Sequence, residues 1–247
     1  MLIAVLSDIH GNCSALESVL DDIRTNRKPD ALVLLGDIID YGMRSNEAVS
    51  MVKGIDIPVI CNIWGNHEHA ILNEDYTRFS SERGVESAKF TKSRLNSDSI
   101  EYLNSIIGKS GKMEFTADGK SFLAVHGSLR DYYWKAVYPD KGNGADGDFA
   151  GYESFDYVLS SHSHYPHVFD RFYECDNPDY RNKKNVIFIN PGSVGQPRNH
   201  NPNAQYALLD TRGSVSLIGV SYDVSYEQSL FTNDVDAFYR DRLTNGV

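Results

Sequence analysis

Short apolar runs that alternate with helical patterns constrain the fold of this chain more than any other feature of its sequence. Residues 2–7, 31–35 and 57–61 are short runs rich in aliphatic side chains, which is typical of buried strands. Between these runs, residues 16–23 carry apolar side chains at helical spacing, and a second helix is expected at residues 45–53. This alternation predicts largely parallel strands joined by helices that cover the sheet.

The second half of the chain is richer in strands. Residues 113–125 predict a hairpin that turns at Asp118-Gly119. Further strand-like runs follow at residues 155–160, 167–174, 185–190, 204–210 and 214–222. We therefore expect mixed sheets packed between helices, and a surface helix at residues 234–243.

The sequence predicts one domain that spans residues 1–247, because it contains no internal repeat, low-complexity tract or flexible linker. Two stretches interrupt the regular pattern. Residues 70–112 are polar with helical pieces, and residues 128–154 are rich in Gly, Asp and aromatic side chains. We expect both stretches to act as lids over a site.

Composition excludes several classes of function. The longest apolar runs are far shorter than a membrane span, and the first residues lack the features of an export signal, so we expect a cytoplasmic protein without a membrane partner. The three cysteines are far apart, which argues against a disulfide framework or a thiolate zinc site. A net charge of −10 argues against binding of duplex nucleic acid. The sequence gives no indication of the oligomeric state.

Aspartate, asparagine and histidine side chains follow the apolar runs. They are Asp8, His10, Asp37, Asp40, Asn66, His67, His126, His162 and His164. Open α/β sheets bind ligands at the carboxyl ends of their strands, so these side chains are expected to converge. Carboxylate, amide and imidazole ligands without thiolates suit manganese, iron or zinc, and the set is larger than one ion requires.

The order of these residues resembles the calcineurin-like metallophosphoesterase superfamily. Its blocks stand here as SDIHGN, GDIIDYG, GNHE, VHGS and SHSH, and NPGSVGQPR at residues 190–198 resembles the bacterial phosphodiesterase branch. Ser161 replaces the usual Gly before the last block. The resemblance implies an α/β fold of four layers, an αββα sandwich of two mixed β-sheets flanked by helices. It also implies two divalent or trivalent metal ions.

The resemblance assigns roles to individual positions. It implies one metal site made by Asp8, His10 and His164, a second made by Asn66, His126 and His162, and Asp37 as the ligand shared by both. His67 would act as the general acid, with Asp40 orienting its ring. Asn12 either caps the first helix or contacts the substrate, and Arg198 either belongs to a shaped turn or contacts the substrate.

The family reaction predicts the function. Two dications among these ligands leave a positive site, which suits hydrolysis of a phosphate ester by a hydroxide held between the metals. Tyr41 stands where phosphatases of the superfamily usually carry an Arg that grips phosphate, so we expect a phosphodiester of a small nucleotide or related compound as the substrate. Alternatives are hydrolysis of a dinucleoside polyphosphate, a phosphomonoester or a phosphoprotein, or a non-catalytic scaffold. The aromatic residues of segment 131–138 either stack on a nucleobase or pack the loop.

Overall fold

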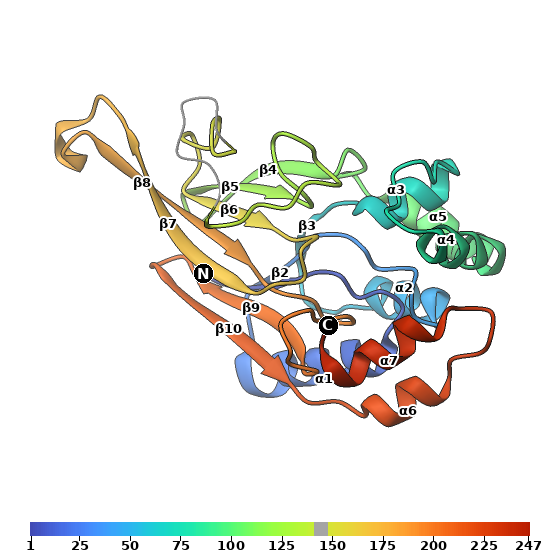
Figure 1. The fold of residues 1–247 in the computed structure, drawn as a ribbon. Coiled ribbons are helices and arrows are strands. Elements are labelled where there is room, and N and C mark those ends of the chain that lie inside the picture. The colour runs from blue at the N-terminus through green and yellow to red at the C-terminus, as the bar shows by residue number, and fades with distance from the viewer. Residues whose placement is uncertain (141–147) are drawn as a thin grey trace.

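The first of two β-sheets carries the strands predicted in the N-terminal part of the chain (Figure 1). A computed structural model describes residues 1–140 and 148–247. In this sheet β1 (Leu2–Leu6), β2 (Ala31–Leu34) and β3 (Val59–Asn62) are parallel, and β9 (Ala204–Asp210) and β10 (Ser214–Val220) extend it antiparallel in the order β10-β9-β1-β2-β3. The predicted parallel core of this sheet is confirmed.

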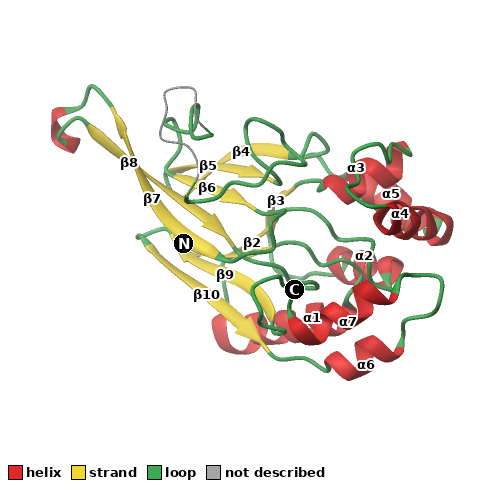
Figure 2. Ribbon diagram, in the orientation of Figure 1, coloured by secondary structure: helices red, strands yellow, loops and turns green. Residues whose placement is uncertain are grey.

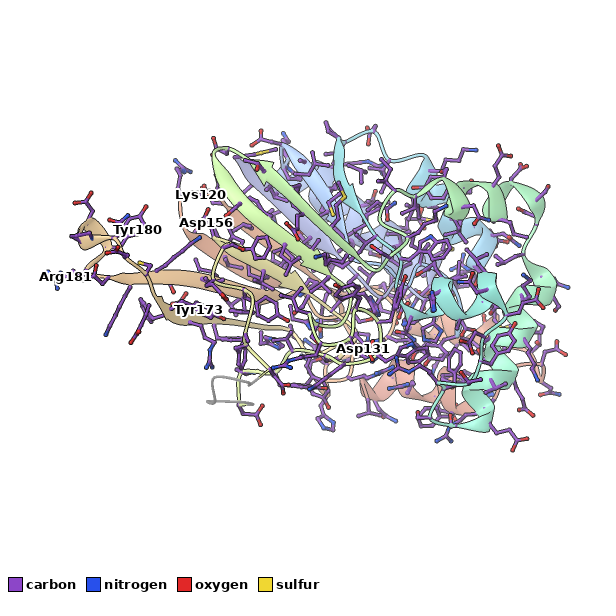
Figure 3. The ribbon with its side chains drawn as sticks, turned by 90° about the horizontal axis from the view of Figure 1, so that it is seen from above. Lys120, Asp131, Asp156, Tyr173, Tyr180 and Arg181 are labelled. Carbon is purple, nitrogen blue, oxygen red and sulfur yellow. The ribbon has the colours of Figure 1, made fainter. Side chains whose placement is uncertain are left out.

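The second sheet is mixed as well. It is made by β4 (Lys112–Ala117), β5 (Lys120–Val125), β6 (Tyr157–Ser160), β8 (Lys183–Asn190) and β7 (His167–Glu174), in that spatial order. The strands β5, β6 and β8 are parallel, and the antiparallel strands β4 and β7 form its edges. The β7–β8 hairpin projects from the body of the protein. A short 3-10 helix (Pro178–Tyr180) lies at the tip of the hairpin, where Figure 3 labels Tyr180 and Arg181.

Helices lie toward the end of the sheets opposite this hairpin tip, and α1 runs along the first sheet beside β9 and β10 (Figure 2). They are α1 (Cys13–Asp22), which continues as a π-helical turn (Ile23–Arg27), α2 (Ser45–Lys53), α3 (Asn66–Asn73), α4 (Glu82–Arg94), α5 (Ser97–Ser105), α6 (Val224–Ser229) and α7 (Ala237–Asn245). Helices α1 and α2 agree with the sequence prediction. Helix α1 follows β1 and α2 follows β2, as the βαβ connections of parallel strands require.

The two sheets pack face to face through the alternating side chains of their strands. On β1, Ile3 and Val5 face the second sheet and contact a core that includes Phe122 and Leu159, whereas Ala4 and Leu6 lie in the core formed with α1 and α2. The outer face of the second sheet packs against residues of the segment that follows β5, including Tyr152. The predicted α/β sandwich of two mixed sheets with helices is confirmed.

The predicted surface helix near the C-terminus is confirmed as α7. One stripe of this helix, made by Tyr239, Arg242 and Leu243, is buried. The ring of Tyr239 stacks on Tyr41 at 4.3 Å between centroids, and Tyr41 belongs to the loop after β2. The sequence hid this contact because only one narrow stripe of α7 is buried, among charged neighbours.

The predicted lid segments have defined structure in part. Residues 70–112 contain the end of α3 together with α4 and α5, and residues 128–154 run without a long helix or strand over their described part. Residues 141–147 of the second segment lie outside the described residues. Their function as lids remains a prediction, as does the single domain. Over the described ranges, none of the helices combines the length and hydropathy needed to cross a membrane.

Candidate metal centre

The predicted ligands leave their strands in an unusual backbone conformation. Asp8, His10, Asp37, His162 and His164 all have φ between 49° and 64°, in the left-handed region that residues other than glycine rarely adopt. Each such residue costs on the order of 1 kcal/mol or more. The strand alternation is broken at these positions, which lets two histidines separated by one residue turn toward the same centre.

Backbone hydrogen bonds hold these strained loops together. The N–H of Asp8 donates to Gly36 O at 3.0 Å, which ties the loop after β1 to the loop after β2. From the C-terminal half, Gly195 N donates to Asp8 O at 2.9 Å and Ser193 Oγ donates to the same oxygen at 2.7 Å. The NPGSVGQPR segment therefore forms a shaped turn that braces Asp8, which is one of the two readings that the sequence allowed.

The structure brings all seven predicted ligands together in two groups. Ligand atoms of Asp8, His10, Asp37 and His164 lie within 4.8 Å of one another, and so do those of Asp37, His126 and His162. Asn66 joins the second group, with its Oδ1 2.8 Å from Nδ1 of His162 and 3.0 Å from Nε2 of His126. Asp37 belongs to both groups, which is the position of a shared ligand.

The orientation of the imidazoles fits metal ligation. The Nδ1 atoms of His10, His126 and His164 contact the carbonyl oxygens of Ile39, Leu35 and Gln196 at 3.2, 2.7 and 2.6 Å. Each of these nitrogens therefore carries a proton, so the lone pair of the neutral ring lies on Nε2, which faces the cluster. Two such lone pairs, on His10 and His164, face each other at 3.4 Å. A cation between them would relieve that repulsion.

Three carboxylate oxygens of the cluster lack a hydrogen-bond partner among the described residues, whereas Oδ1 of Asp37 accepts the N–H of His67 at 2.9 Å. Both side-chain oxygens of Asp8 and Oδ2 of Asp37 are buried without a hydrogen-bond partner among the described residues. Buried polar atoms are rarely left unsatisfied, and buried carboxylates are normally paired or bound to a metal. The donor set, the tautomers and these orphaned oxygens together fit two first-row metal ions.

Burial and neighbouring charges set the protonation states of the metal-free cluster. Burial raises the pKa of Asp8 to about 7 and lowers the pKa of His10 and His164 well below the usual range. Burial would also raise the pKa of Asp37, but the imidazoles of His126 and His67 hold it below its usual range. Burial opposes the charge of His126, yet Asp37 at 3.2 Å raises its pKa to about 9.

Sequence reasoning gave no role to Glu68, which the structure buries completely. Its carboxylate accepts the backbone N–H groups of Asp37 and Gly65, both at 2.8 Å, and that of Ile38 at 2.7 Å. Glu68 thus fixes the loop that carries the shared ligand. Its place three residues after Gly65, in the first turn of α3, is the signal of a helix-capping carboxylate.

His67 and Asp40 form the predicted pair. Nδ1 of His67 lies 2.7 Å from Oδ2 of Asp40, and both side chains are buried. The other oxygen of Asp40 accepts hydrogen bonds from Ser87 Oγ at 2.7 Å and Thr91 Oγ1 at 2.8 Å. Sequence reasoning missed these two residues of α4. Their signal is a pair of polar side chains four positions apart on the buried face of a helix.

The structure places Asn12 and Arg198 in different surroundings. Asn12 accepts the N–H of Ala15 at 3.0 Å as a helix cap, and its amide donates to Gly195 O and Tyr222 Oη. These contacts favour the capping role. Arg198 instead lines the pocket beside the cluster, and its Nε is buried without a hydrogen-bond partner among the described residues. Contact of either residue with a substrate remains a prediction.

A pocket of about 330 Å³ opens onto the cluster. Its lining includes Asp37, Asn66, His67, His162 and His164, together with Tyr41, Arg78, Phe79, Ser80, Trp134 and Arg198. Tyr41, which stands at the position of the phosphate-gripping Arg, packs its ring 4.5 Å from the rings of both His10 and His67. Ser161, the other departure from the family pattern, places its Oγ 3.0 Å from Nδ1 of His126 and thereby supports that ring.

Comparison with known proteins identifies the family. A model of the calcineurin-like phosphoesterase superfamily domain matches residues 1–214. The chain belongs to the calcineurin-like phosphoesterase superfamily. An uncharacterised protein of Methanocaldococcus jannaschii is 29% identical over 252 residues, which cover 99% of this chain and 98% of that protein.

Solved structures agree with this assignment. A metallophosphoesterase from Sphaerobacter thermophilus is 27% identical, covers 100% of this chain and 99% of its own, and superposes with a TM-score of 0.76. A hypothetical protein from Pyrococcus horikoshii shares the fold, with 20% identity, coverage of 100% and 98%, and a TM-score of 0.79. This calcineurin-like phosphoesterase therefore shares the fold of a solved metallophosphoesterase, and its His and Asp cluster provides candidate metal ligands.

Metal binding to the calcineurin-like phosphoesterase should release protons. At pH 7 the metal-free protein holds a proton on His126 and a partial proton on Asp8, since their pKa values are about 9 and about 7. Both groups bind metal only without these protons, so about one to two protons should leave and affinity should fall as the pH is lowered. Titration calorimetry with Mn²⁺ in buffers of different ionisation enthalpy measures the number of protons released.

The control for this titration is His69→Gln, because His69 stacks on Tyr133 and takes no part in the cluster. The variant should release the same number of protons as the wild type. A heat of binding that does not depend on the buffer would contradict the assigned protonation states.

Gly65→Ala should disrupt the centre. A Cβ atom at Gly65 would lie 2.0 Å from Oδ1 of Asp37 and 2.6 Å from its backbone nitrogen. We expect a loss of about 1–3 kcal/mol of stability and of most bound metal, because the shared ligand must move. Gly219→Ala in β10 is the control, since its φ is not positive and the nearest atom to its added Cβ lies at 3.5 Å, an ordinary contact. It should keep its metal, as measured by elemental analysis.

Proposed function

We propose that this protein hydrolyses a phosphodiester of a small nucleotide or a related compound, using two metal ions held by its buried cluster. The observation that carries the proposal is the sharing of Asp37 between two ligand groups, beside an open pocket that also exposes His67. When bound, ions such as manganese, iron or zinc would lower the pKa of water and neutralise phosphate charge. The other steps fall to side chains of this chain.

His67 is placed to serve the leaving group. Asp40 accepts from Nδ1, so Nε2 is the ring nitrogen that can act toward the pocket. Burial would lower the pKa of His67, but the carboxylates of Asp37 and Asp40 raise it. A protonated ring beside the phosphate can donate its proton to the departing oxygen, which is the step that limits release of a poor leaving group.

The charges of the pocket favour a diester. Arg198 has no ion-pair partner among the described residues, whereas Arg78 is paired with Asp131 at 2.6 Å. Tyr41 fills the position from which an Arg would grip phosphate, and its ring is held by Tyr239. One unpaired guanidinium suits the single negative charge of a diester better than the two charges of a monoester.

A substrate panel tests this proposal directly. The manganese-loaded protein is assayed with bis(p-nitrophenyl) phosphate, p-nitrophenyl phosphate, cyclic nucleotides, dinucleoside polyphosphates and a phosphopeptide. We expect the highest kcat/KM for diesters. A higher value for the monoester or the phosphopeptide would overturn the diester assignment, and an inactive protein that binds no metal although its ligands are intact would point to a scaffold.

Two variants separate metal binding from proton donation. His67→Ala should retain its metal and lose about two to four orders of magnitude in kcat, because only the general acid is removed. Asp37→Ala should lose metal as well as activity, since it removes a ligand from both groups. Metal content by mass spectrometry is measured together with turnover of a diester whose leaving group is an alcohol, such as a cyclic nucleotide, because p-nitrophenolate departs without a proton. A fully active His67→Ala protein would disprove the assigned role.

Arg198→Gln tests the substrate contact. Loss of a hydrogen bond to a charged group costs about 1.5–3 kcal/mol, so KM for a diester should rise by roughly tenfold or more while metal content stays the same. Arg212→Gln is the matched control, because Arg212 is exposed and paired with Asp210. An unchanged KM in Arg198→Gln would show that Arg198 belongs to the shaped turn and does not contact the substrate.

A further inference from the structure

We propose that Phe79 and Trp134 form a subsite for an aromatic leaving group, whose biological form is a nucleoside. The inference rests on the proposed function and names the part of the substrate that lies beside His67. It gives a role to aromatic side chains that the metal chemistry does not use. Both rings line the pocket and both are half-buried, so part of each remains open to a ligand.

The rings of Phe79 and Trp134 contact each other, and each contacts a histidine of the candidate site. Trp134 meets Phe79 edge to face, with centroids 5.4 Å apart and an angle of 80° between the rings. Phe79 in turn contacts His67 at 5.2 Å, and Trp134 lies 6.3 Å from His162. The pocket is thus lined by predicted ligands and by two aromatic rings, Phe79 and Trp134, which we call the aromatic wall. Phe79 lies next to the proposed proton donor His67.

The position of Phe79 identifies which half of the substrate it meets. His67 gives its proton to the departing oxygen, so the group attached to that oxygen must lie next to the His67 ring. Phe79 packs directly on that ring. Arg198 and Tyr41 also line the pocket but carry polar groups that suit the phosphate. A leaving group with a flat apolar face therefore finds its contacts at Phe79 and Trp134.

The aromatic wall is held in place before any ligand arrives. The guanidinium of Arg78 lies 5.5 Å from the ring centre of Trp134 and binds Asp131 at 2.6 Å. Asp131 also accepts the backbone N–H groups of Tyr133 and Trp134, and Figure 3 places it among the loops near the helical end. The ion pair joins the segment after α3 to the segment after β5, and a prepositioned ring loses little entropy on binding.

Stacking on such a platform accepts any nucleobase, because every base has an aromatic face. Removal of one stacking side chain should change affinity by roughly tenfold. The same two rings could instead only pack the loops against each other. The two readings differ in one respect, because a packing role predicts no dependence of binding on whether the ligand carries a ring.

Nucleoside binding provides the first test. The chain has two tryptophans, and Trp64 is buried with its N–H donated to Leu103 O, so Trp134 is the one exposed to the pocket. Adenosine should quench the fluorescence of the wild type, and Phe79→Leu should weaken this binding by roughly tenfold. Inorganic phosphate should give no comparable quench. Absence of an adenosine-dependent change in the wild type, with or without manganese, would overturn the inference.

Steady-state kinetics provides the second test. It shows whether the aromatic rings contact the leaving group or the group that the phosphate retains. In methyl p-nitrophenyl phosphate only the leaving group is aromatic. Trp134→Leu should raise KM for this substrate by roughly tenfold with a smaller effect on kcat, and Trp134→Phe should restore the affinity. The increase in KM caused by Trp134→Leu should be the same for bis(p-nitrophenyl) phosphate as for methyl p-nitrophenyl phosphate. An increase confined to the bis-aryl substrate would place the ring on the retained group and overturn the assignment.

Tyr132→Leu is the matched control for both tests. Tyr132 belongs to the same loop as Trp134 but is exposed, contacts Lys112 and does not line the pocket. Adenosine binding and KM should stay at the wild-type level in this variant. The fluorescence test remains decisive if no phosphodiester is hydrolysed, so failure of the subsite and failure of the proposed function can be told apart.

Discussion

The buried carboxylate of Asp37 is the constraint on which the rest of the centre depends. It lies in both ligand groups, with 1% of its surface exposed, and its oxygens have His126 and His67 as neighbours. Burying a carboxylate costs several kcal/mol unless opposite charge or hydrogen bonds compensate. The fold supplies both, through the imidazoles around the side chain and through the backbone N–H of His67, which donates to Oδ1 of Asp37 at 2.9 Å. Moving Asp37 would therefore disturb both groups together.

The loops around Asp37 are strained, and the surrounding structure holds them. Left-handed residues such as Asp8 and His164 are stabilised by hydrogen bonds from segments that are distant in the sequence, among them Gly195 N to Asp8 O and His164 Nδ1 to Gln196 O. Strain of this kind is kept where it positions functional groups. The two packed sheets provide the rigid support, because interiors at crystal-like density resist the shifts that would relax the loops.

Much of the site could be predicted because its chemistry is local in sequence. Each block places a ligand within a few residues of a strand end, so the blocks and the strands together indicated the seven ligands, His67 and Asp40. The roles of Glu68, Ser87 and Thr91 were not predicted, because they depend on which side chain each buried polar atom meets. The burial of Tyr239 against Tyr41 escaped prediction for the same reason, since it joins two segments almost 200 residues apart.

The sequence by itself determined the strand and helix pattern of the first half, the residue types of the ligands and the family they resemble. Periodicity and residue chemistry are properties of neighbouring positions, so they can be read without coordinates. Only the tertiary structure decided that Asn12 caps a helix, that Glu68 holds the loop of Asp37, and that Arg198 and Trp134 reach the same pocket. Contacts of this kind depend on how the two sheets and the loops between them pack, which no single stretch of sequence encodes.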